Sequence, residues 1–377
     1  MRDRYPAVPA VFAVEDTTAQ LVWGHLPPGA ARVTAGGVEV VVEGDGGPAA
    51  ALLEGLPPDR FLEVVVEREG ASPAPAEGLR TLAPPPGREL FRFATVNDIH
   101  LGDPRFGKWP AIPHPDDGGE PPPQRCLRAA VAELREWGAE LVVAKGDLTD
   151  HGTVEEWRVA AELLSGAGAP VEAIPGNHDV CAGAITGHEI LAAAGIRYLT
   201  GGAGARDVPG ARLVLGDTTI RGRDRGTLAG ITDEVASLAA EAGGPAVVAV
   251  HHHPQRRRVA THPPQGVPGA EARPFLDALA AANPATLVTS GHSHRHRRHR
   301  WGPLTVVEVG SPQDFPGTWA GYVVHEGGIR QVVRRIAAPQ ALRWTDSTRR
   351  AFLGLWGHWA PGTLDQRCFS LAWPHLT

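Results

Sequence analysis

Five short motifs of histidine, aspartate and asparagine occur in one order along this chain of 377 residues. Four of them directly follow a short apolar run, which is typical of a buried strand. Loops at the ends of neighbouring strands meet at one edge of a sheet, so the motifs are predicted to bring carboxylate, amide and imidazole groups together. Such an edge can hold two metal ions. The motifs are Asp98-Ile99-His100, Gly146-Asp147, Gly176-Asn177-His178-Asp179, His251-His252-His253-Pro254 and Gly291-His292-Ser293-His294.

The segments between the motifs alternate between strand and helix patterns. Apolar residues at helical spacing predict helices. One helix start is marked by Thr153 with Glu156 three residues later, which is the pattern of a capping box. We therefore expect an α/β catalytic domain over 90–338, with an antiparallel end. Its strands are predicted at 90–96, 141–144, 171–174, 212–215, 246–250, 286–289, 304–309, 321–325 and 329–336.

The two ends of the chain have different patterns from this central part. Residues 1–83 contain short strand-like runs separated by Gly/Pro turns, which predict a small all-β sandwich domain. A stretch rich in Pro, Ala and Gly over 71–87 predicts a linker, which leads through 84–89 into the catalytic domain. The tail, 339–377, is expected to pack against the body, with a helix over 347–356 whose Phe352, Leu355 and Trp356 face inward.

Composition limits the partners and the compartment. The net charge of −6 gives the protein no general affinity for nucleic acid or for an anionic membrane. Its three cysteines (Cys126, Cys181 and Cys368) are far apart and show no disulfide framework, as in a reducing compartment. No apolar run approaches the length of a membrane span, and no signal peptide is recognised. We expect a cytoplasmic protein and leave its oligomeric state open.

Each motif supplies a particular kind of metal ligand. Asp98 and His100 are two residues apart, so both can bind one cation, and His292 and His294 have the same spacing. The carboxylate of Asp147 has two oxygens and can bridge two metals. Two divalent ions about 4 Å apart repel each other by roughly 15–20 kcal/mol at an effective dielectric constant of 20, and a shared carboxylate offsets part of this repulsion. One such motif is weak evidence, whereas five in order indicate a metal site.

The order of the motifs resembles that of the calcineurin-like metallophosphoesterase superfamily, and the resemblance covers roughly residues 90–325. It implies a β-sandwich flanked by helices, with two metal ions at the strand ends. In the family the ligating histidine lies two residues before the proline, which selects His252 from the triplet. The resemblance implies that Asp98, His100 and His294 bind the first ion, that Asn177, His252 and His292 bind the second, and that Asp147 is shared.

The resemblance also bears on which metals are bound. The implied ligand set contains no thiolate, so two divalent ions of Mn, Fe or Zn are expected rather than copper. Purple acid phosphatases have a tyrosine three residues after the shared aspartate, and this tyrosine stabilises ferric iron. Asp150 occupies that position here, so the purple ferric site is not expected.

In such a mechanism the metals would activate a water molecule for attack on a phosphate ester. By resemblance, His178 is not a ligand but lies beside the leaving-group oxygen, and Asp179 orients its ring. Arginines follow the last two motifs, namely Arg256, Arg257 and Arg258 in one run, and Arg295, Arg297, Arg298 and Arg300 in the other. Of these, Arg256, Arg295 and Arg297 are candidate contacts to a small phosphorylated substrate.

The sequence leaves the substrate class open. The run from Gly146 to Asp150 and the His-His-Pro motif are most similar to class III cyclic-nucleotide phosphodiesterases and glycerophosphodiesterases. The N-terminal module instead resembles the fibronectin type III domain that precedes the catalytic domain in purple acid phosphatases. A phosphodiesterase is therefore the first hypothesis and a phosphomonoesterase without the tyrosine ligand is the alternative. A non-catalytic, metal-bound binding protein is a further alternative.

Overall fold

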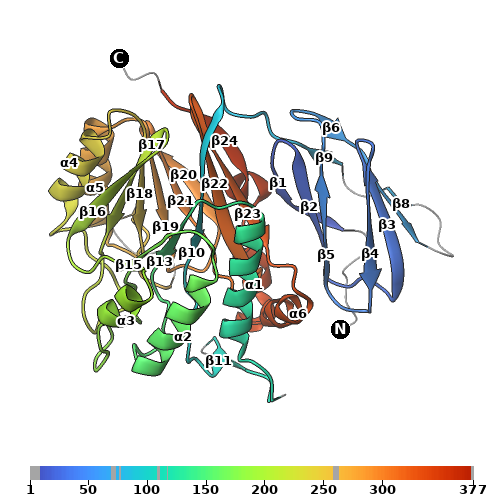
Figure 1. Cartoon of the computed structure of the whole chain (residues 1–377), viewed down its shortest axis with the longest axis horizontal. Helices are drawn as coiled ribbons and strands as arrows, with labels where there is room; N and C mark the ends of the chain where they lie inside the picture. Colours follow the sequence, from blue (N-terminus) through green and yellow to red (C-terminus); the bar gives the residue numbers. More distant parts are fainter. Residues whose placement is uncertain are drawn as a thin grey trace.

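The computed structural model describes residues 9–68, 74–75, 78–107, 111–116, 118–257 and 263–374. Arg258 and parts of the predicted N-terminal domain and linker lie outside these ranges. Figure 1 shows a small all-β region, in blue, beside a larger part in which sheets are flanked by helices. The predicted fold class is confirmed, because an α/β catalytic region follows a small all-β region.

The catalytic region contains two large sheets. In the first sheet three strands are parallel, namely β10 (Glu89–Val96), β13 (Leu141–Lys145) and β14 (Val171–Ile174). In the second sheet four are parallel, namely β17 (Ala211–Gly216), β18 (Ala246–Val250), β19 (Thr286–Ser290) and β21 (Leu304–Glu308). The first has the order β15 (Arg197–Tyr198), β14 (Val171–Ile174), β13 (Leu141–Lys145), β10 (Glu89–Val96), β22 (Thr318–His325), β23 (Gly328–Arg335) and β24 (Phe369–Ala372). The second has the order β16 (Ala203–Val208), β17 (Ala211–Gly216), β18 (Ala246–Val250), β19 (Thr286–Ser290), β21 (Leu304–Glu308) and β20 (Arg297–Trp301).

The two sheets pack face to face. Apolar residues of both, such as Phe93 of β10 and Leu287 of β19, belong to one buried cluster. Polar contacts also join them: the Lys145 ammonium donates to Thr289 Oγ1 at 3.0 Å, and Thr289 Oγ1 lies 2.9 Å from the Tyr322 hydroxyl. A buried polar group is costly unless it has a hydrogen-bond partner. These contacts therefore favour one position of the first sheet relative to the second.

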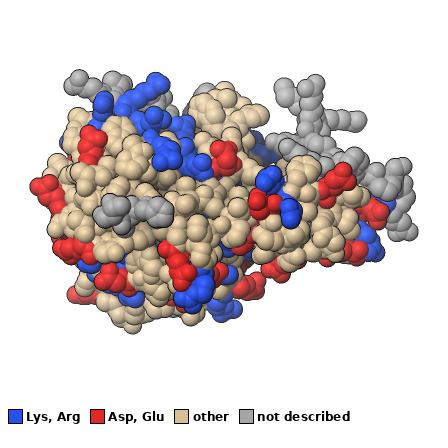
Figure 2. All heavy atoms as spheres, turned by 90° about the horizontal axis from the view of Figure 1, so that it is seen from above, with Lys and Arg blue, Asp and Glu red and all other residues tan. Residues whose placement is uncertain are grey.

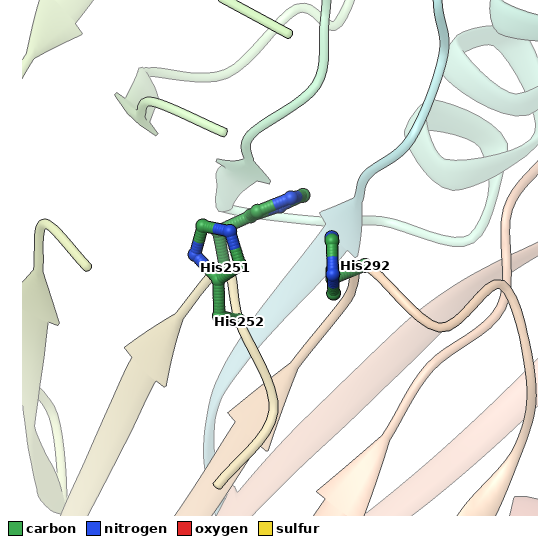
Figure 3. Close-up of side chains that lie close together, drawn as sticks. All are labelled: His251, His252 and His292. Atoms are coloured by element: carbon green, nitrogen blue, oxygen red, sulfur yellow. The ribbon is translucent and has the colours of Figure 1, made fainter. Parts of the chain in front are cut away.

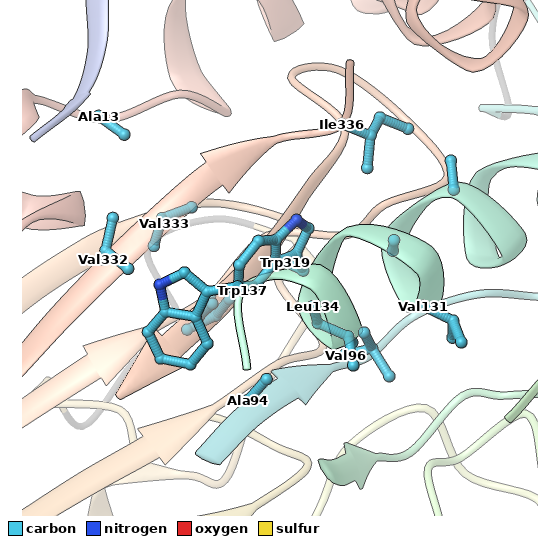
Figure 4. Close-up of a cluster of buried hydrophobic side chains, with 14 of the residues drawn as sticks. Ala13, Ala94, Val96, Val131, Leu134, Trp137, Trp319, Val332, Val333 and Ile336 are labelled. Atoms are coloured by element: carbon cyan, nitrogen blue, oxygen red, sulfur yellow. The ribbon is translucent and has the colours of Figure 1, made fainter. Parts of the chain in front are cut away.

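Helices cover the outer faces of the sandwich. One group comprises α1 (Pro122–Glu136), α2 (Val154–Ser165) and α3 (His188–Ala193), and the other comprises α4 (Thr232–Ala240) and α5 (Gly269–Ala282). The predicted capping box is present, because Thr153 Oγ1 accepts from Glu156 N and the Glu156 carboxylate accepts from Thr153 N. Figure 4 shows α1 against the sheet, where the Trp137 and Trp319 rings meet edge to face with centroids 5.7 Å apart.

The N-terminal region consists of two small sheets and a short two-stranded pair. Its core contains the buried side chains of Leu21, Trp23, Val33 and Leu53. One sheet has the order β1 (Ala10–Val14), β2 (Thr18–Trp23) and β5 (Ala49–Glu54), and the other has β4 (Val38–Gly44), β3 (Gly29–Ala35), β7 (Val64–Arg68) and β8 (Ala74–Pro75). The pair is β6 (Phe61–Leu62) with β9 (Leu79–Arg80).

A buried ion cluster joins the N-terminal region to the catalytic sheet. Glu15 follows β1 and contacts Arg330 and Arg334 on β23, with 3.2 Å between Glu15 Oε2 and Arg330 Nη2. Gln20 adds two hydrogen bonds with the backbone of Arg335, of 2.7 and 2.8 Å. Burial alone would raise the pKa of Glu15, but the charges of Arg334 and Arg330 hold it below its ordinary value.

The tail differs from its predicted form. The helix expected over 347–356 is wrong, because α6 (Pro339–Thr348) has ended before Phe352 and Leu353, whose φ angles are 52° and 59°. The chain continues as η1 (Phe352–Gly354), α7 (Trp356–Trp359) and α8 (Leu364–Arg367) before β24 joins the first sheet. Trp356 is buried as expected, whereas Phe352 and Leu355 are exposed. A left-handed backbone at two successive residues breaks the helical period on which the prediction relied.

Two further features complete the fold. A hairpin of β11 (Arg105–Phe106) and β12 (Ile112–Pro113) lies after the first motif, and the Phe106 ring packs against Trp356 with centroids 5.9 Å apart. Among the described residues, no helix is both long enough and apolar enough to cross a membrane.

Replacing Glu15 by Gln is expected to destabilise the protein at neutral pH, because the buried Arg330 and the partly buried Arg334 both lose a carboxylate, and Arg330 keeps only its contact with Asp16 among the described carboxylates. Breaking a buried pair of this kind costs about 3–5 kcal/mol. The pKa of Glu15 in the folded state lies below its ordinary value of 4.5. The stabilisation is therefore complete above pH 4.5 and is lost as the pH falls through the folded-state pKa. Urea denaturation of both proteins at pH 7 and at pH 3–4 measures this, and a stability difference that does not shrink in acid contradicts it.

Candidate metal centre

All five motifs lie where strands end. Asp98 and His100 follow β10, Asp147 follows β13, and Asn177 and His178 follow β14 in the first sheet. The remaining two motifs follow β18 and β19 of the second sheet. Figure 3 shows His251, His252 and His292 at these strand ends, gathered near the end of β10. The motifs therefore converge between the two sheets rather than along the edge of one.

The backbone of these loops is strained at the motif residues. Among the described residues, eight other than glycine have a positive φ, and five of the eight belong to the motifs. Such conformations cost of order 1–3 kcal/mol each and persist where surrounding contacts fix them. Here the Asp98 amide donates to Gly146 O at 2.9 Å, and the His292 amide donates to Asp98 Oδ2 at 2.9 Å. The five are Asp98 (57°), His100 (52°), Asp147 (51°), His292 (65°) and His294 (53°).

Gly176 shows why the third motif begins with glycine. A Cβ atom at this position would lie 2.2 Å from Asp147 Oδ1 and 2.3 Å from Asp147 N, closer than atoms can approach. The loop of the third motif therefore passes directly over the carboxylate of the second. In this arrangement the amide of His178 donates to Asp147 Oδ1 at 2.8 Å.

The first cluster of candidate ligands consists of Asp98, His100 and His294, with Asp147 beside it. Two imidazole nitrogens, His100 Nε2 and His294 Nε2, lie 3.2 Å apart. His294 Nε2 is 3.6 Å from Asp98 Oδ1, and His100 Nε2 is 3.8 Å from Asp147 Oδ2. Ligands about 2.0–2.2 Å from one ion stand at similar separations from each other, so the cluster fits a divalent cation.

The second cluster contains Asp147, Asn177, His292 and two members of the histidine triplet. His251 Nε2 lies 3.2 Å from Asp147 Oδ2 and 3.3 Å from Asn177 Oδ1. His252, which the family resemblance selected, directs Nδ1 to Thr218 Oγ1 at 2.8 Å. The nearest ligand atoms of His251, His252 and His292 all lie within 4.8 Å of one another. The structure thus adds His251 as a candidate that the sequence had assigned to the end of the strand.

Unsatisfied buried nitrogens show that this donor set suits a cation. His252 Nε2 and His292 Nδ1 are buried without a hydrogen-bond partner, and such atoms are costly unless something binds them. Burial, together with neighbouring imidazoles, holds the pKa of both histidines well below its ordinary value. They are therefore neutral at physiological pH, which is the form that binds metals. The residues present thus fit the two ions that the resemblance implies.

Asp314 and Trp356 support the first cluster, and no sequence motif marked either residue. The buried Asp314 carboxylate contacts His294 Nδ1 through Oδ2 at 2.5 Å. Its other oxygen accepts from Trp356 Nε1 at 2.9 Å. A carboxylate on one ring nitrogen fixes the tautomer and directs the other nitrogen toward a metal. The tail, which carries Trp356, therefore forms part of the site.

The pairing predicted between Asp179 and the His178 ring is wrong. His178 Nδ1 lies 2.9 Å from the Asp150 carboxylate, at the position where purple acid phosphatases have tyrosine. The Asp179 carboxylate instead accepts hydrogen bonds from the amides of Thr149 and Gly176, each at 2.9 Å, so its oxygens are occupied by the backbone. Asp179 therefore holds the second and third motifs together, and Asp150 is the residue that the sequence reasoning missed.

Neighbouring carboxylates favour the protonated form of the His178 ring and raise its pKa. Burial opposes its charged form, but the hydrogen bond to Asp150 and the charges of Asp147 and Asp150 raise the pKa of His178 to about 10. The ring lies at the edge of the first cluster, with its centroid 4.5 Å from that of His100. A group in this position can donate a proton at neutral pH.

The three candidate substrate contacts lie together. Arg256, Arg295 and Arg297 line one cavity of about 750 Å³ beside the histidine clusters. Arg295 is buried, whereas Arg256 is exposed. Burial and the charge of Arg297 lower the pKa of Arg295 to about 10, so its guanidinium still carries a positive charge at neutral pH.

Comparison with known proteins gives one family. Residues 91–296, more than half of the chain, match the model described as calcineurin-like phosphoesterase. No curated protein matches the chain. The solved structure of PhoD has 11% sequence identity to this chain and a TM-score of 0.46. The match covers 89% of this chain and 88% of the PhoD chain. Purple acid phosphatase PPD1 from yellow lupin seeds is 12% identical with a TM-score of 0.47, covering 88% and 73%. Phosphopantetheinyl hydrolase from Mycobacterium tuberculosis is 13% identical with a TM-score of 0.37, covering 60% and 91%.

Replacing Asp314 by Asn is expected to weaken metal binding roughly 10–100-fold, because the His294 ring loses the carboxylate that orients it. Competition with a fluorescent chelator measures the affinity. Asp277→Asn is the matched control, since Asp277 also accepts from an indole, Trp301 Nε1 at 2.8 Å, but in an exposed place. Equal metal affinity of the Asp314 and Asp277 variants would show that the contact is not needed.

Proposed function

The chain belongs to the calcineurin-like phosphoesterase family and is a metal-dependent phosphoric ester hydrolase, and we propose that it is a two-metal phosphodiesterase. One observation in particular supports the proposal that two ions bind. The carboxylate of Asp147 lies between the two clusters, with Oδ2 3.8 Å from His100 Nε2 on one side and 3.2 Å from His251 Nε2 on the other. A carboxylate between two neighbouring cations offsets part of their mutual repulsion.

The proposed ligands follow the two clusters. Asp98, His100 and His294 hold the first ion, Asn177 and His292 hold the second, and Asp147 is shared. For the remaining position the family resemblance favours His252, whereas the short distances from His251 Nε2 to Asp147 and Asn177 support His251. The second ring nitrogen does not distinguish the two, because His251 Nδ1 lies 2.7 Å from Lys145 O and His252 Nδ1 lies 2.8 Å from Thr218 Oγ1. We choose His251 because its Nε2 faces both Asp147 and Asn177.

Residues of the chain would orient the reacting groups and supply a proton. When bound, the two ions supply positive charge for the phosphoryl oxygens and make water a stronger nucleophile. His178 would donate a proton to the leaving-group oxygen, and the Asp150 carboxylate, 2.9 Å from His178 Nδ1, orients its ring. Asp179 acts indirectly, since its hydrogen bonds hold the loops that carry Asp147 and Asn177.

The preference for diesters rests on the second motif. Its form, Gly146-Asp147-Leu148-Thr149-Asp150, resembles that of diesterases, and Asp150 pairs with His178 in place of the iron-binding tyrosine. The N-terminal module supports the alternative of a monoesterase. Its strand orders, β1-β2-β5 and β4-β3-β7-β8, support a fibronectin III-like domain. We propose that this domain covers 1–83 and that the catalytic domain covers 90–338.

A substrate panel tests the proposed activity. Protein loaded with Mn, Fe or Zn is assayed on bis-p-nitrophenyl phosphate, p-nitrophenyl phosphate and cyclic AMP. A diesterase hydrolyses bis-p-nitrophenyl phosphate with higher kcat/KM than the monoester, and the reverse order supports the monoesterase. Metal-loaded protein that is inactive on all three supports a non-catalytic binding protein instead.

His178→Ala is expected to keep both ions and to lose about 10²–10⁴-fold in kcat, because a proton donor and not a ligand is removed. Activity and metal content are measured on the same preparation. Equal loss of metal and of activity would show that His178 is a ligand. His178→Gln serves as a second variant that keeps the polar character of the side chain.

His251→Ala is expected to lose the second ion, while His252→Ala keeps it. The reason is that His251 Nε2 lies 3.2 Å from Asp147 Oδ2 and 3.3 Å from Asn177 Oδ1, which are both proposed ligands of that ion. Elemental analysis of both variants after dialysis gives the number of ions per chain. The opposite pattern, with the ion lost from His252→Ala alone, would show that His252 and not His251 binds the second ion.

A further inference from the structure

A basic cavity adjoins the metal centre. It encloses about 750 Å³, which is within the size range of small-molecule sites. Among its described lining residues, Glu308 is the one acidic side chain, and the arginines are Arg256, Arg257, Arg295, Arg297 and Arg298. Figure 2 shows Lys and Arg side chains gathered at one edge of the larger part of the molecule. The net charge of the whole chain is −6, so this concentration of positive charge is local.

The cavity wall is built into the fold and is not simply a solvated face. Arg295 is only 2% exposed, and Arg298 lies over the Phe369 ring at 4.4 Å from its centroid. Glu308 is buried as well. Packing thus holds positive side chains around one space although their charges repel each other, and an anion in that space would relieve the repulsion.

The cavity continues directly from the proposed metal ligands. Arg295 follows the proposed ligand His294 in the chain, and His253, which also lines the cavity, lies two residues after the proposed ligand His251. The His253 ring stacks on His292 with centroids 5.9 Å apart. The cavity therefore lies next to the proposed ligand His292, with the His253 ring between them, and it offers a basic site beside the place of the reacting phosphate.

We propose that this cavity binds a second phosphate group of the substrate, so that the preferred substrates carry at least two phosphates. This inference rests on the phosphoesterase function proposed above. The planar guanidinium group donates two parallel hydrogen bonds to phosphate, which makes arginine the suitable residue for this task. The ring of Trp359, 49% exposed in the cavity wall, offers a surface for the organic part between the two phosphates.

A pair of chromogenic diesters isolates the second phosphate. Thymidine 5′-(p-nitrophenyl phosphate) and its 3′-phosphorylated form have the same leaving group and differ only in the added phosphate. Wild-type protein is expected to hydrolyse the 3′-phosphorylated form with kcat/KM at least about tenfold higher. In the double variant Arg256→Gln, Arg297→Gln the ratio is expected to fall to near one.

The ratio of the two rates is the readout, because it does not depend on how much of the protein is folded and loaded with metal. Arg80→Gln, which changes an exposed arginine of the N-terminal region, is the control and should keep the wild-type ratio. A ratio near one in wild-type protein, or a preference that survives in the double variant, would overturn the inference.

If neither diester is hydrolysed, the proposed phosphodiesterase function is contradicted. A binding experiment then tests the phosphate site by itself. Calorimetry then compares thymidine 3′,5′-bisphosphate with thymidine 5′-phosphate on metal-free protein. Tighter binding of the bisphosphate that is lost in the double variant supports a phosphate site in the cavity. Equal affinities for the two nucleotides would overturn it.

Discussion

The carboxylate of Asp147 is buried where the two sheets of the sandwich meet. Burial opposes its charge, yet His251 and the neighbouring imidazoles hold the pKa of Asp147 well below its ordinary value. The buried charge is stabilised because each carboxylate oxygen has a partner. The His178 amide donates to Oδ1, and His251 Nε2 lies beside Oδ2. The close approach of Gly176 and the positive φ of Asp147 follow from placing two loops around this one group.

Parts of the chain that carry no motif support this arrangement. The tail supplies Trp356, which fixes Asp314 and, through it, the ring of His294. Glu15 binds the N-terminal region to β23, whose neighbour β22 pairs with β10, the strand that Asp98 follows. The regions outside the catalytic sandwich are thus connected to the site through a few buried polar contacts. Buried ions of this kind are costly when one partner is lost, so they restrict how the regions can move.

Features that depend on residues close together in the sequence, such as single strands and helix caps, could be predicted from the sequence. The strand at 171–174 and the capping box at Thr153 were predicted to the residue, because apolar runs and caps act within a few positions. The strand Arg297–Trp301 was missed, since its charged residues form a strand only beside β21. The partners of His178 and His294 were likewise beyond the sequence, because Asp150 and Asp314 lie 28 and 20 residues away in the chain. The order of the motifs selected the family, whereas the choice among three adjacent histidines depends on side-chain direction.

The number of metal ions bound per chain tests the central claim most directly. Wild-type protein and Asp147→Asn are saturated with Mn or Zn, dialysed, and analysed for metal and protein in the same sample. If both clusters share Asp147, wild-type protein retains two ions per chain and the variant loses affinity for both, because the amide cannot offset the repulsion between them. A single ion in wild-type protein, or two ions held equally tightly by Asp147→Asn, would contradict the two-metal account.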